Sequence, residues 1–303
     1  MSSEGDGTLR ISPVARRIAV DAGLDVRGLE GTGPDGRILR RDVEGAIAGR
    51  KRTAEQARPR TPAAEPAARP ASGSAPQGKS EPLSRLRQAI ARRMTQSKQT
   101  QPHYYLTLDV DMTEAMRFRD QLNESAGETQ RVSVNDLLIK ACATALERHP
   151  KFNAEFAENG LKMHERINVD IGIALDEGLI APAILDCGSK SLGRIAQESK
   201  DLIARAKSGG LTAAEYGEGT FTITNLGAYG VETLIGIINP PQAAILGVGS
   251  VMDQPVARDG QIVIRKMMKL ALSADHRVTD GAEGAGFIKE IQGLLENPVR
   301  LAL

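Results

Sequence analysis

The sequence predicts an α/β protein in two parts: a small all-helical domain, then a larger two-layer α+β domain with a mixed sheet. Three observations predict this. Two short helical segments flank a glycine-rich loop before residue 50. Residues 50–80 are rich in Ala, Pro and Arg and lack an apolar period, whereas strand-like and helix-like segments alternate from residue 83 onward. The expected divisions are a tail at 1–8, a helical domain at 9–48, a flexible linker at 49–80 and the large domain at 81–303.

Composition excludes several classes of function. A chain of 303 residues that is 41% hydrophobic can form about two domains with a sizeable core. The 39 Lys and Arg residues balance 38 Asp and Glu residues, so no net field attracts nucleic acid or a membrane. Cys142 and Cys187 lie in apolar segments without metal-ligand spacing, as reduced thiols do, and no segment could span a bilayer. We therefore expect a soluble, cytoplasmic protein with no metal site and no affinity for nucleic acid or membranes.

The helical domain begins with a clear helix signal. Ser12 is a suitable N-cap, Pro13 suits the first turn, and Gly23 ends the segment. Val14 and Ile18, with Ala22 as a further candidate, share one face of the predicted helix.

A second helix is expected to begin near Asp42 and to stop at Gly49. The loop between the helices contains four glycines but matches neither the dinucleotide-binding nor the P-loop spacing. We interpret it as a structured loop in which glycine permits a positive φ. A core this small favours docking over catalysis, and residues 50–80 would act as a mobile tether.

In the larger domain, an amphipathic helix at 83–99 places Leu83, Leu86, Ile90 and Met94 on one face and ends at Gln101. The pattern then predicts a strand at 103–112, a helix at 114–124, an apolar helix opened by Ser133 or Asn135, two strands within 167–185 joined at 176–178, and a helix at 191–209. The hairpin among these elements indicates a mixed sheet with helices stacked on one side.

Two stretches near the C-terminus carry candidate chemistry. A strand at 220–224 ends at Thr224 before a glycine-rich loop, and the alternating strand 266–272 leads into Ala274-Asp275-His276-Arg277-Val278-Thr279-Asp280-Gly281. Imidazole titrates near neutrality, so His276, placed among carboxylates and an arginine, could act as a general base. The structural alternatives are that the charges are solvated turn residues, that His276 caps the next helix, and that Thr224 is a strand-end cap.

The stretch SPVARRIAVDAGLDVRGLEGTGPDGRILRRDVE resembles the peripheral subunit-binding domain of 2-oxo acid dehydrogenase acyltransferases, including its GTGxxGR loop. The resemblance implies that Arg16, Arg17 and Arg37 contact an acidic surface of a partner, either the 2-oxo acid dehydrogenase or dihydrolipoamide dehydrogenase. Arginine suits this role because it binds carboxylates in a bidentate manner. Val20 departs from family members that carry a further arginine there, which leaves the choice of partner open.

The larger domain is similar to the catalytic domain of dihydrolipoamide acyltransferases, which resembles chloramphenicol acetyltransferase in fold. The matching segments, in order, are PHYYL at 102–106, DEGLIAPAI at 176–184, FTITNLG at 221–227, INPPQAAILGVG at 238–249 and LSADHRVTDG at 272–281. The resemblance implies acyl transfer between coenzyme A and dihydrolipoamide. Acetyl is the preferred acyl group, and succinyl and branched-chain groups remain alternatives.

By this resemblance His276 removes the thiol proton, Thr224 donates to the oxyanion, and Asp280 supports the site more than Asp275 does. Family members form homotrimers that assemble into larger cores and complete each site from two subunits. The segments that bind coenzyme A are not identified. The sequence contains no lipoyl domain, so lipoamide would come from another polypeptide or from a longer parent chain. The alternatives are a non-catalytic scaffold component and an antibiotic-type acetyltransferase.

Overall fold

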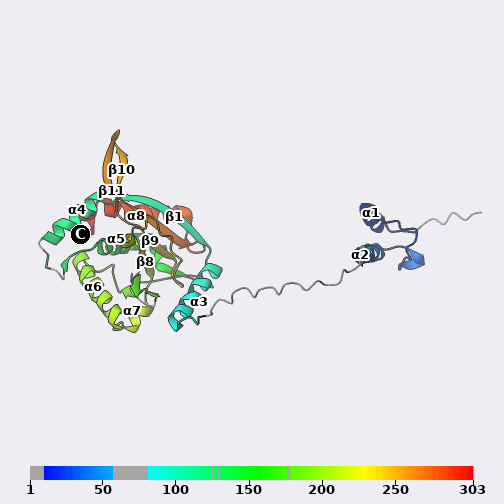
Figure 1. Ribbon diagram of the computed structural model, residues 1–303, viewed down its shortest axis with the longest axis horizontal. Coiled ribbons are helices and arrows are strands. Elements are labelled where there is room, and N and C mark those ends of the chain that lie inside the picture. Colours follow the sequence, from blue (N-terminus) through cyan, green and yellow to red (C-terminus); the bar gives the residue numbers. More distant parts are fainter. Residues whose placement is uncertain (1–9, 57–80, 125, 128–129, 176–177, 303) are drawn as a thin grey trace, which may run out of the picture. The chain divides into compact units, whose positions relative to one another are not determined.

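The computed structural model describes residues 10–56, 81–124, 126–127, 130–175 and 178–302. The chain divides into two compact units, Met1–Lys79 and Ser80–Leu303 (Figure 1). The expected tail at 1–8 and most of the expected linker at 49–80 lie outside the described residues. Within the described part of the chain, no helix is both long enough and apolar enough to cross a membrane.

The first unit contains helix α1 (Pro13–Asp21), a short 3-10 turn η1 (Pro34–Gly36) and helix α2 (Arg40–Gln56). The predicted cap is confirmed, because Ser12 Oγ accepts a hydrogen bond from the Ala15 amide at 3.3 Å. Of the apolar residues on the predicted face, Ile18 packs against the core of this unit, whereas Val14 is 56% exposed and does not form the contact. Small side chains form the contact instead, and the buried cluster consists of Ala15, Ala19, Ile38 and Val43.

Helix α2 continues through Gly49 to Gln56, so the predicted stop at Gly49 is wrong. A glycine inside a helix costs only about 1 kcal/mol relative to alanine, and the following residues include good helix formers. The start of α2 is fixed by Asp42, whose carboxylate accepts from the Leu39 amide at 2.9 Å and from the Thr32 amide at 3.0 Å. These bonds, led by that from Leu39, lower the pKa of Asp42.

The second unit is an α+β domain built on a mixed seven-stranded sheet, as predicted. Its sheet order is β1-β11-β9-β8-β4-β7, with β10 also paired to β11, and two small hairpins, β2-β3 and β5-β6, stand apart. The elements are α3 (Arg85–Thr100), β1 (His103–Asp111), α4 (Thr113–Glu124), α5 (Val134–Arg148), η3 (Pro150–Asn153), β2 (Ala154–Ala157), β3 (Gly160–Met163), β4 (Val169–Ile171), β5 (Ile173–Leu175), β6 (Gly178–Ile180), β7 (Ala183–Ile184), α6 (Leu192–Ser208), α7 (Ala213–Gly217), β8 (Phe221–Asn225), η4 (Gly227–Tyr229), β9 (Ala244–Val248), β10 (Met252–Arg258), β11 (Gln261–Asp275), α8 (Gly281–Glu296) and η5 (Pro298–Leu301).

Strand β11 is the longest strand of the described sheet and is twice the predicted length. Its first half pairs with β10 in a hairpin that projects from the domain (Figure 1). Its second half lies between β1 and β9, and this part is buried from Leu270 to Asp275. The strand therefore delivers residue 276 to one end of the sheet on a backbone that is paired on both sides.

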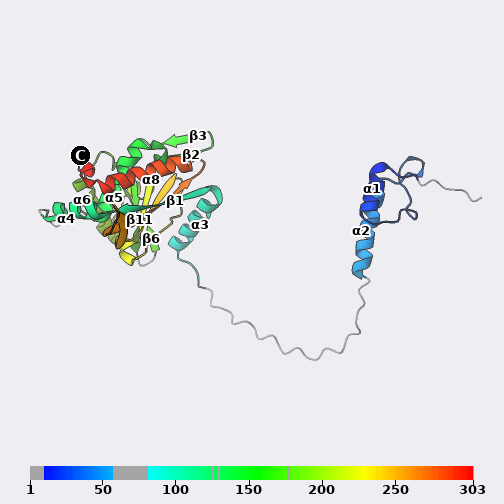
Figure 2. The ribbon, with the colours of Figure 1, turned by 90° about the horizontal axis from the view of Figure 1, so that it is seen from above.

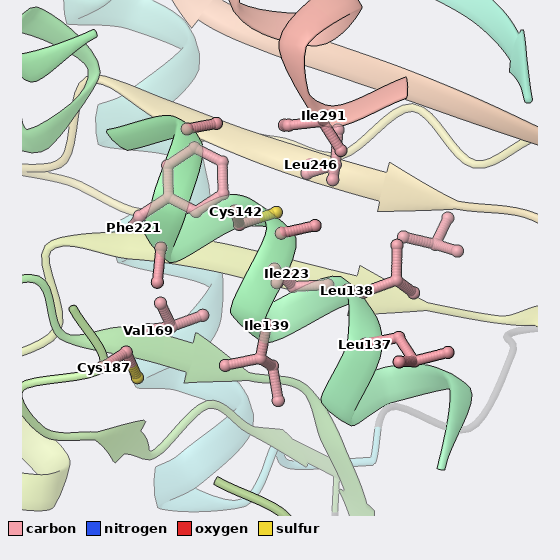
Figure 3. Close-up of a cluster of buried hydrophobic side chains, with 14 of the residues drawn as sticks. Leu137, Leu138, Ile139, Cys142, Val169, Cys187, Phe221, Ile223, Leu246 and Ile291 are labelled. Atoms are coloured by element: carbon pink, nitrogen blue, oxygen red, sulfur yellow. The ribbon is translucent and has the colours of Figure 1, made fainter. Parts of the chain in front are cut away.

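Helices α5 and α8 cover one face of the sheet (Figure 2). Helix α5 begins at the Ser133 cap, one of the two predicted caps, and Asp136 completes a reciprocal capping pair. Its apolar side chains meet those of β4, β8 and β9 in a core where Cys142 and Cys187 are both buried (Figure 3). Burial raises the pKa of the Cys187 thiol to about 12, so this thiol stays protonated near neutral pH.

The region 167–185 departs from the predicted pair of long strands. It forms two short antiparallel pairs of strands, in which β4 pairs with β7 inside the main sheet and β5 pairs with β6 outside it. The break falls at Gly172, whose amide bonds to the Ile223 carbonyl of β8. Of the predicted junction at 176–178, only Gly178 is a described residue. Leu83 precedes α3 and is 56% exposed. A methyl group added at Gly178 would lie 3.5 Å from Leu86 Cδ2 and 3.6 Å from Ile90 Cδ1, so these two side chains of the predicted face point toward Gly178.

Candidate active site

His276 lies at the start of a turn that joins β11 to α8, which we call the histidine turn (residues 275–280). The Val278 and Thr279 amides both donate to the Asp275 carbonyl, at 3.0 and 3.1 Å. The His276 amide donates to the Pro102 carbonyl at 2.8 Å, which ties the turn to the start of β1. The imidazole is exposed, so it is free to meet a substrate or a second subunit.

One side of the imidazole is bounded by Tyr104 on β1. The two rings meet edge to face with their centroids 5.3 Å apart, and the Tyr104 hydroxyl lies 2.9 Å from the Thr279 hydroxyl. Burial raises the pKa of Tyr104, so the phenol stays neutral and holds the turn through a hydrogen bond rather than through charge.

Asp280 is the N-cap of α8. Its Oδ1 accepts from the Ala282 and Glu283 amides, each at 2.9 Å, and the Glu283 carboxylate accepts in return from the Asp280 amide at 3.1 Å. The hydrogen bond from the Glu283 backbone amide has the largest effect in lowering the pKa of Asp280. Electrostatic attraction to His276 and Lys151 lowers this pKa further. The helix cap predicted as one alternative for His276 is therefore supplied by Asp280.

Asp275 is fully buried, whereas its neighbours His276 and Arg277 are exposed. The Arg277 guanidinium binds the Asp275 carboxylate through Nε at 3.0 Å and Nη2 at 2.7 Å. The sequence-based alternative that these charges are merely solvated does not describe Asp275.

Thr224 lies near the end of β8 and is half-buried. A methyl group added at Gly172 would lie 3.6 Å from Thr224 Oγ1 and 3.7 Å from Leu179 Cδ1, so the hydroxyl lies beside the β5-β6 hairpin. The next residue, Asn225, donates to Asn135 Oδ1 at 2.7 Å and accepts from the Gly227 amide at 2.7 Å. These bonds fix the loop that follows Thr224.

Within one chain, Thr224 and His276 do not meet. Thr224 is paired with Gly247, and Gly247 is paired with Ala271 of β11, five residues before His276. Strands β8 and β11 are separated by β9. Standard strand geometry then places Thr224 about 17 Å along the strands and about 10 Å across them from His276. A single subunit therefore does not bring the predicted oxyanion donor to the predicted base.

Sequence reasoning missed a buried polar group behind the histidine turn. Asp170 of β4 accepts from Gln242 Nε2 at 2.6 Å, and the Gln242 carbonyl accepts from Gln101 Nε2 at 2.9 Å. His103 lies nearby, where its Nδ1–H donates to the Gln101 carbonyl and its Nε2 accepts from the Ile238 amide. No spacing in the sequence links these residues, because they come from separate strands and loops.

The three predicted partner-binding arginines all lie on the surface of the first unit. Arg16 and Arg17 are exposed on α1, and Arg37 is exposed directly after η1. None of the three forms an ion pair with another described residue. Their charges are therefore available to an acidic surface.

The described residues contain no cluster of His, Cys, Asp and Glu suited to a metal ion. Two hollows in the surface, one lined in part by Arg119 and Arg131 and the other by Lys190 and Arg205, include none of the candidate catalytic residues.

Comparison with protein families gives two matches. A model described as the catalytic domain of 2-oxoacid dehydrogenase acyltransferases matches residues 75–303, and one described as the E3 binding domain matches residues 9–44.

Two relatives illustrate the similarity along the whole chain. The dihydrolipoyllysine-residue acetyltransferase component of the pyruvate dehydrogenase complex of Zymomonas mobilis is 38% identical over 297 residues, which is 98% of this chain and 67% of the relative. The mitochondrial counterpart from Schizosaccharomyces pombe is 38% identical over 298 residues, which is 96% of this chain and 61% of the relative.

Two solved structures share the fold of the second unit. A probable dihydrolipoamide acetyltransferase from Listeria monocytogenes is 36% identical with a TM-score of 0.69, covering 74% of this chain and 96% of that one. The dihydrolipoamide acetyltransferase of Azotobacter vinelandii is 34% identical with a TM-score of 0.70, covering 74% and 94%. That structure concerns the role of one serine, one histidine and one asparagine in the catalytic mechanism.

Proposed function

The chain belongs to the family of 2-oxoacid dehydrogenase acyltransferases, and we propose that it transfers an acetyl group between dihydrolipoamide and coenzyme A as the core of a pyruvate dehydrogenase complex. The family match covers the whole second unit, and the relatives that match along the full chain are acetyltransferase components of that complex. Both substrates are thiols or thioesters, so the reaction needs a base for a thiol and a donor for an oxyanion.

The observation that carries the proposal is a coincidence of spacing. The serine and histidine of the Azotobacter enzyme are as far apart in sequence as Thr224 and His276, and its asparagine follows the histidine as Asp280 follows His276. Threonine retains the hydroxyl of serine, and aspartate retains a side-chain oxygen of asparagine at the same place. This spacing supports the assignment of Thr224, His276 and Asp280 to the roles of those three residues.

In the proposed mechanism, His276 removes the proton from the acceptor thiol, because the thiolate is the nucleophile. The thiolate attacks the thioester carbonyl of the donor and forms a tetrahedral intermediate with a negative oxygen. The Thr224 hydroxyl donates a hydrogen bond to that oxygen; loss of one such donor typically slows a reaction about 100- to 1000-fold. Collapse of the intermediate releases the donor as a thiolate, which takes the proton back from His276.

We further propose that each site is completed by a second copy of the chain. The pairing of β8, β9 and β11 separates Thr224 from His276 in one subunit, while the exposed imidazole remains accessible to a neighbour. A homotrimer with three shared sites fits a closed cyclic arrangement. Lipoamide would be presented by a lipoyl domain, and coenzyme A would enter as the second substrate.

The first unit serves to dock a partner enzyme in this proposal. Its family model is the E3 binding domain, which implies dihydrolipoamide dehydrogenase as the partner. The exposed guanidinium groups of Arg16, Arg17 and Arg37 would bind acidic side chains of that enzyme. The pyruvate dehydrogenase component is the other partner to test.

The experiment is an assay of acetyl transfer from acetyl-CoA to free dihydrolipoamide by the wild type and by the His276→Ala and Thr224→Ala variants. We expect the His276 variant to lose activity and the Thr224 variant to lose about 100- to 1000-fold in kcat. Succinyl-CoA and isobutyryl-CoA test the acyl group, and turnover of either above that of acetyl-CoA would contradict the acetyl assignment. A wild type without transfer activity would instead indicate a non-catalytic scaffold.

A further inference from the structure

The Asp275 carboxylate uses both of its oxygens for hydrogen bonds although its side chain is fully buried. Oδ1 accepts from the Arg277 amide at 3.0 Å and from Arg277 Nε at 3.0 Å. Oδ2 accepts from Arg277 Nη2 at 2.7 Å and from Gln101 Nε2 at 3.3 Å. A buried carboxylate is stable only with such compensation, so the side-chain geometry of this pair is strongly constrained.

The guanidinium is also held on its flat face. Arg277 Cζ lies 4.3 Å from the centre of the Phe156 ring, which belongs to the β2-β3 hairpin. The contact combines stacking with attraction between a cation and an aromatic ring. Arg277 is therefore fixed by Asp275 at its edge and by Phe156 at its face.

On its other side, Asp275 is joined to the interior of the sheet. Gln101, which is 6% exposed, donates both to Asp275 and to the Gln242 carbonyl. The Asp275 amide donates to the Ala243 carbonyl at 2.8 Å. The residue just before His276 is thus anchored in the core through its backbone and its side chain.

We propose that Asp275 is a positioning residue that sets the direction of the His276 imidazole. The residue before His276 is anchored in the core, and the residue after it is tied to the same carboxylate through its amide and its guanidinium. His276 therefore has little freedom to change its backbone angles. The inference rests on the proposed role of His276 as the base, and it assigns to Asp275 a larger part than the sequence indicates.

Loss of this positioning would lower the rate of the chemical step. A displacement of about 1 Å in a reacting group can reduce a rate about 100-fold. The Asp275 carboxylate is buried and holds Arg277 through hydrogen bonds within the chain, so substrate binding does not depend on these bonds. Loss of the pair therefore lowers kcat and leaves KM for both substrates nearly unchanged.

The test compares four variants of the full chain. Asp275→Asn keeps the shape of the side chain but removes its charge. Arg277→Lys keeps the charge but removes the two-pronged contact. Asp111→Asn is the matched control, because Asp111 also pairs with arginines, at the opposite end of the β1-β11 ladder. His276→Ala measures the activity that remains without the base.

We expect Asp275→Asn and Arg277→Lys to lower kcat about 10- to 100-fold with KM within about twofold of wild type. The Asp111 variant should keep kcat although it also loses an ion pair. Histidine ring signals of the isotopically labelled chain should show a shift for His276 in the two former variants and not in the control.

Several outcomes would overturn the proposal. One is wild-type kcat in Asp275→Asn together with an inactive His276→Ala, because the base would then work without its anchor. Wild-type kcat in Arg277→Lys would likewise remove the geometric argument, and this variant decides the matter if Asp275→Asn does not fold. Full activity in His276→Ala would instead refute the proposed function on which the inference rests.

Discussion

At the scale of single residues, Asp280 combines a structural and a chemical role. It caps α8 by accepting hydrogen bonds from the Glu283 and Ala282 amides, and these bonds lower the pKa of its carboxyl group. The nearby His276 adds to this lowering of the pKa. The side-chain oxygen of an asparagine can accept the same hydrogen bonds from the backbone amides without carrying a charge.

We therefore expect Asp280→Asn to keep the melting temperature of the wild type and to retain most of the acetyl transfer, whereas Asp280→Ala should lower both. Calorimetry and the transfer assay provide the two measurements. If Asp280→Asn were as unstable as Asp280→Ala, the cap would not explain the role of this side chain.

The burial of Asp170 leads to a prediction on how the stability of the protein depends on pH. Its side chain is buried at 3% exposure, and burial raises its pKa from 3.8 to about 6, although bonds from Gln242, Thr222 and Asn239 act against this rise. Because the folded pKa exceeds the unfolded one, the contribution to stability is present below about pH 4 and is lost as the pH rises through about 6. The loss amounts to about 3 kcal/mol.

Asp170→Asn cannot ionise, so it should not show this loss. We expect the free energy of unfolding of the wild type, measured relative to Asp170→Asn by urea titration, to fall between about pH 4 and about pH 7. A difference that stays constant over this range would contradict the assignment.

Some residues of the candidate site could be predicted from the sequence, and others could not. His276 follows a strand with a clear alternating pattern, Thr224 lies at the end of a predicted strand, and both lie in segments that carry the family resemblance, so both could be selected. The anchoring of Asp275 could not be predicted, because it depends on Gln101, 174 residues away in the chain. In sequence, Asp275 and Asp280 are both acidic neighbours of His276, and only the fold shows which one is buried.

At the scale of elements, glycines of the first unit differ in whether the surrounding backbone leaves room for a side chain. A methyl group on Gly31 would lie 2.4 Å from the Arg37 carbonyl carbon and 2.4 Å from the Gly36 oxygen, which no backbone can accommodate without moving. The same group on Gly28 would meet nothing within 4 Å. The close approach at Gly31 explains why the loop between α1 and α2 requires glycine there.

We expect Gly31→Ala to abolish binding of dihydrolipoamide dehydrogenase in titration calorimetry and to leave acetyl transfer to free dihydrolipoamide unchanged. Gly28→Ala is the control and should retain both properties. Wild-type binding by Gly31→Ala would show that this loop does not determine the docking surface.

The order and type of most elements follow from sequence pattern, but only some of their ends do. The cap at Ser133 and the end of α6 at Gly209, which has a positive φ of 77°, act through local chemistry that the sequence displays. Helix α2 runs past Gly49, and β11 is longer than its apolar core, because pairing with β10 continues the strand beyond the buried region. Neighbouring elements therefore set these ends.

At the scale of the whole molecule, the separation of Thr224 and His276 leads to a test of assembly. If each site combines Thr224 of one subunit with His276 of another, a chain that lacks His276 can still supply an intact Thr224. A chain that lacks Thr224 can still supply an intact His276. Two variants that are inactive alone would then complement each other in a mixed oligomer.

We expect equal co-expression of Thr224→Ala and His276→Ala to restore about one quarter of wild-type activity, because random assembly gives that share of interfaces with both residues intact. Each variant alone, and a mixture of separately assembled oligomers, serve as controls. If both residues of a site came from one chain, every site would lack one of them, and the co-expressed sample would be no more active than the better single variant. Recovery in the co-expressed sample alone would therefore place the active site between subunits and make assembly a condition of catalysis.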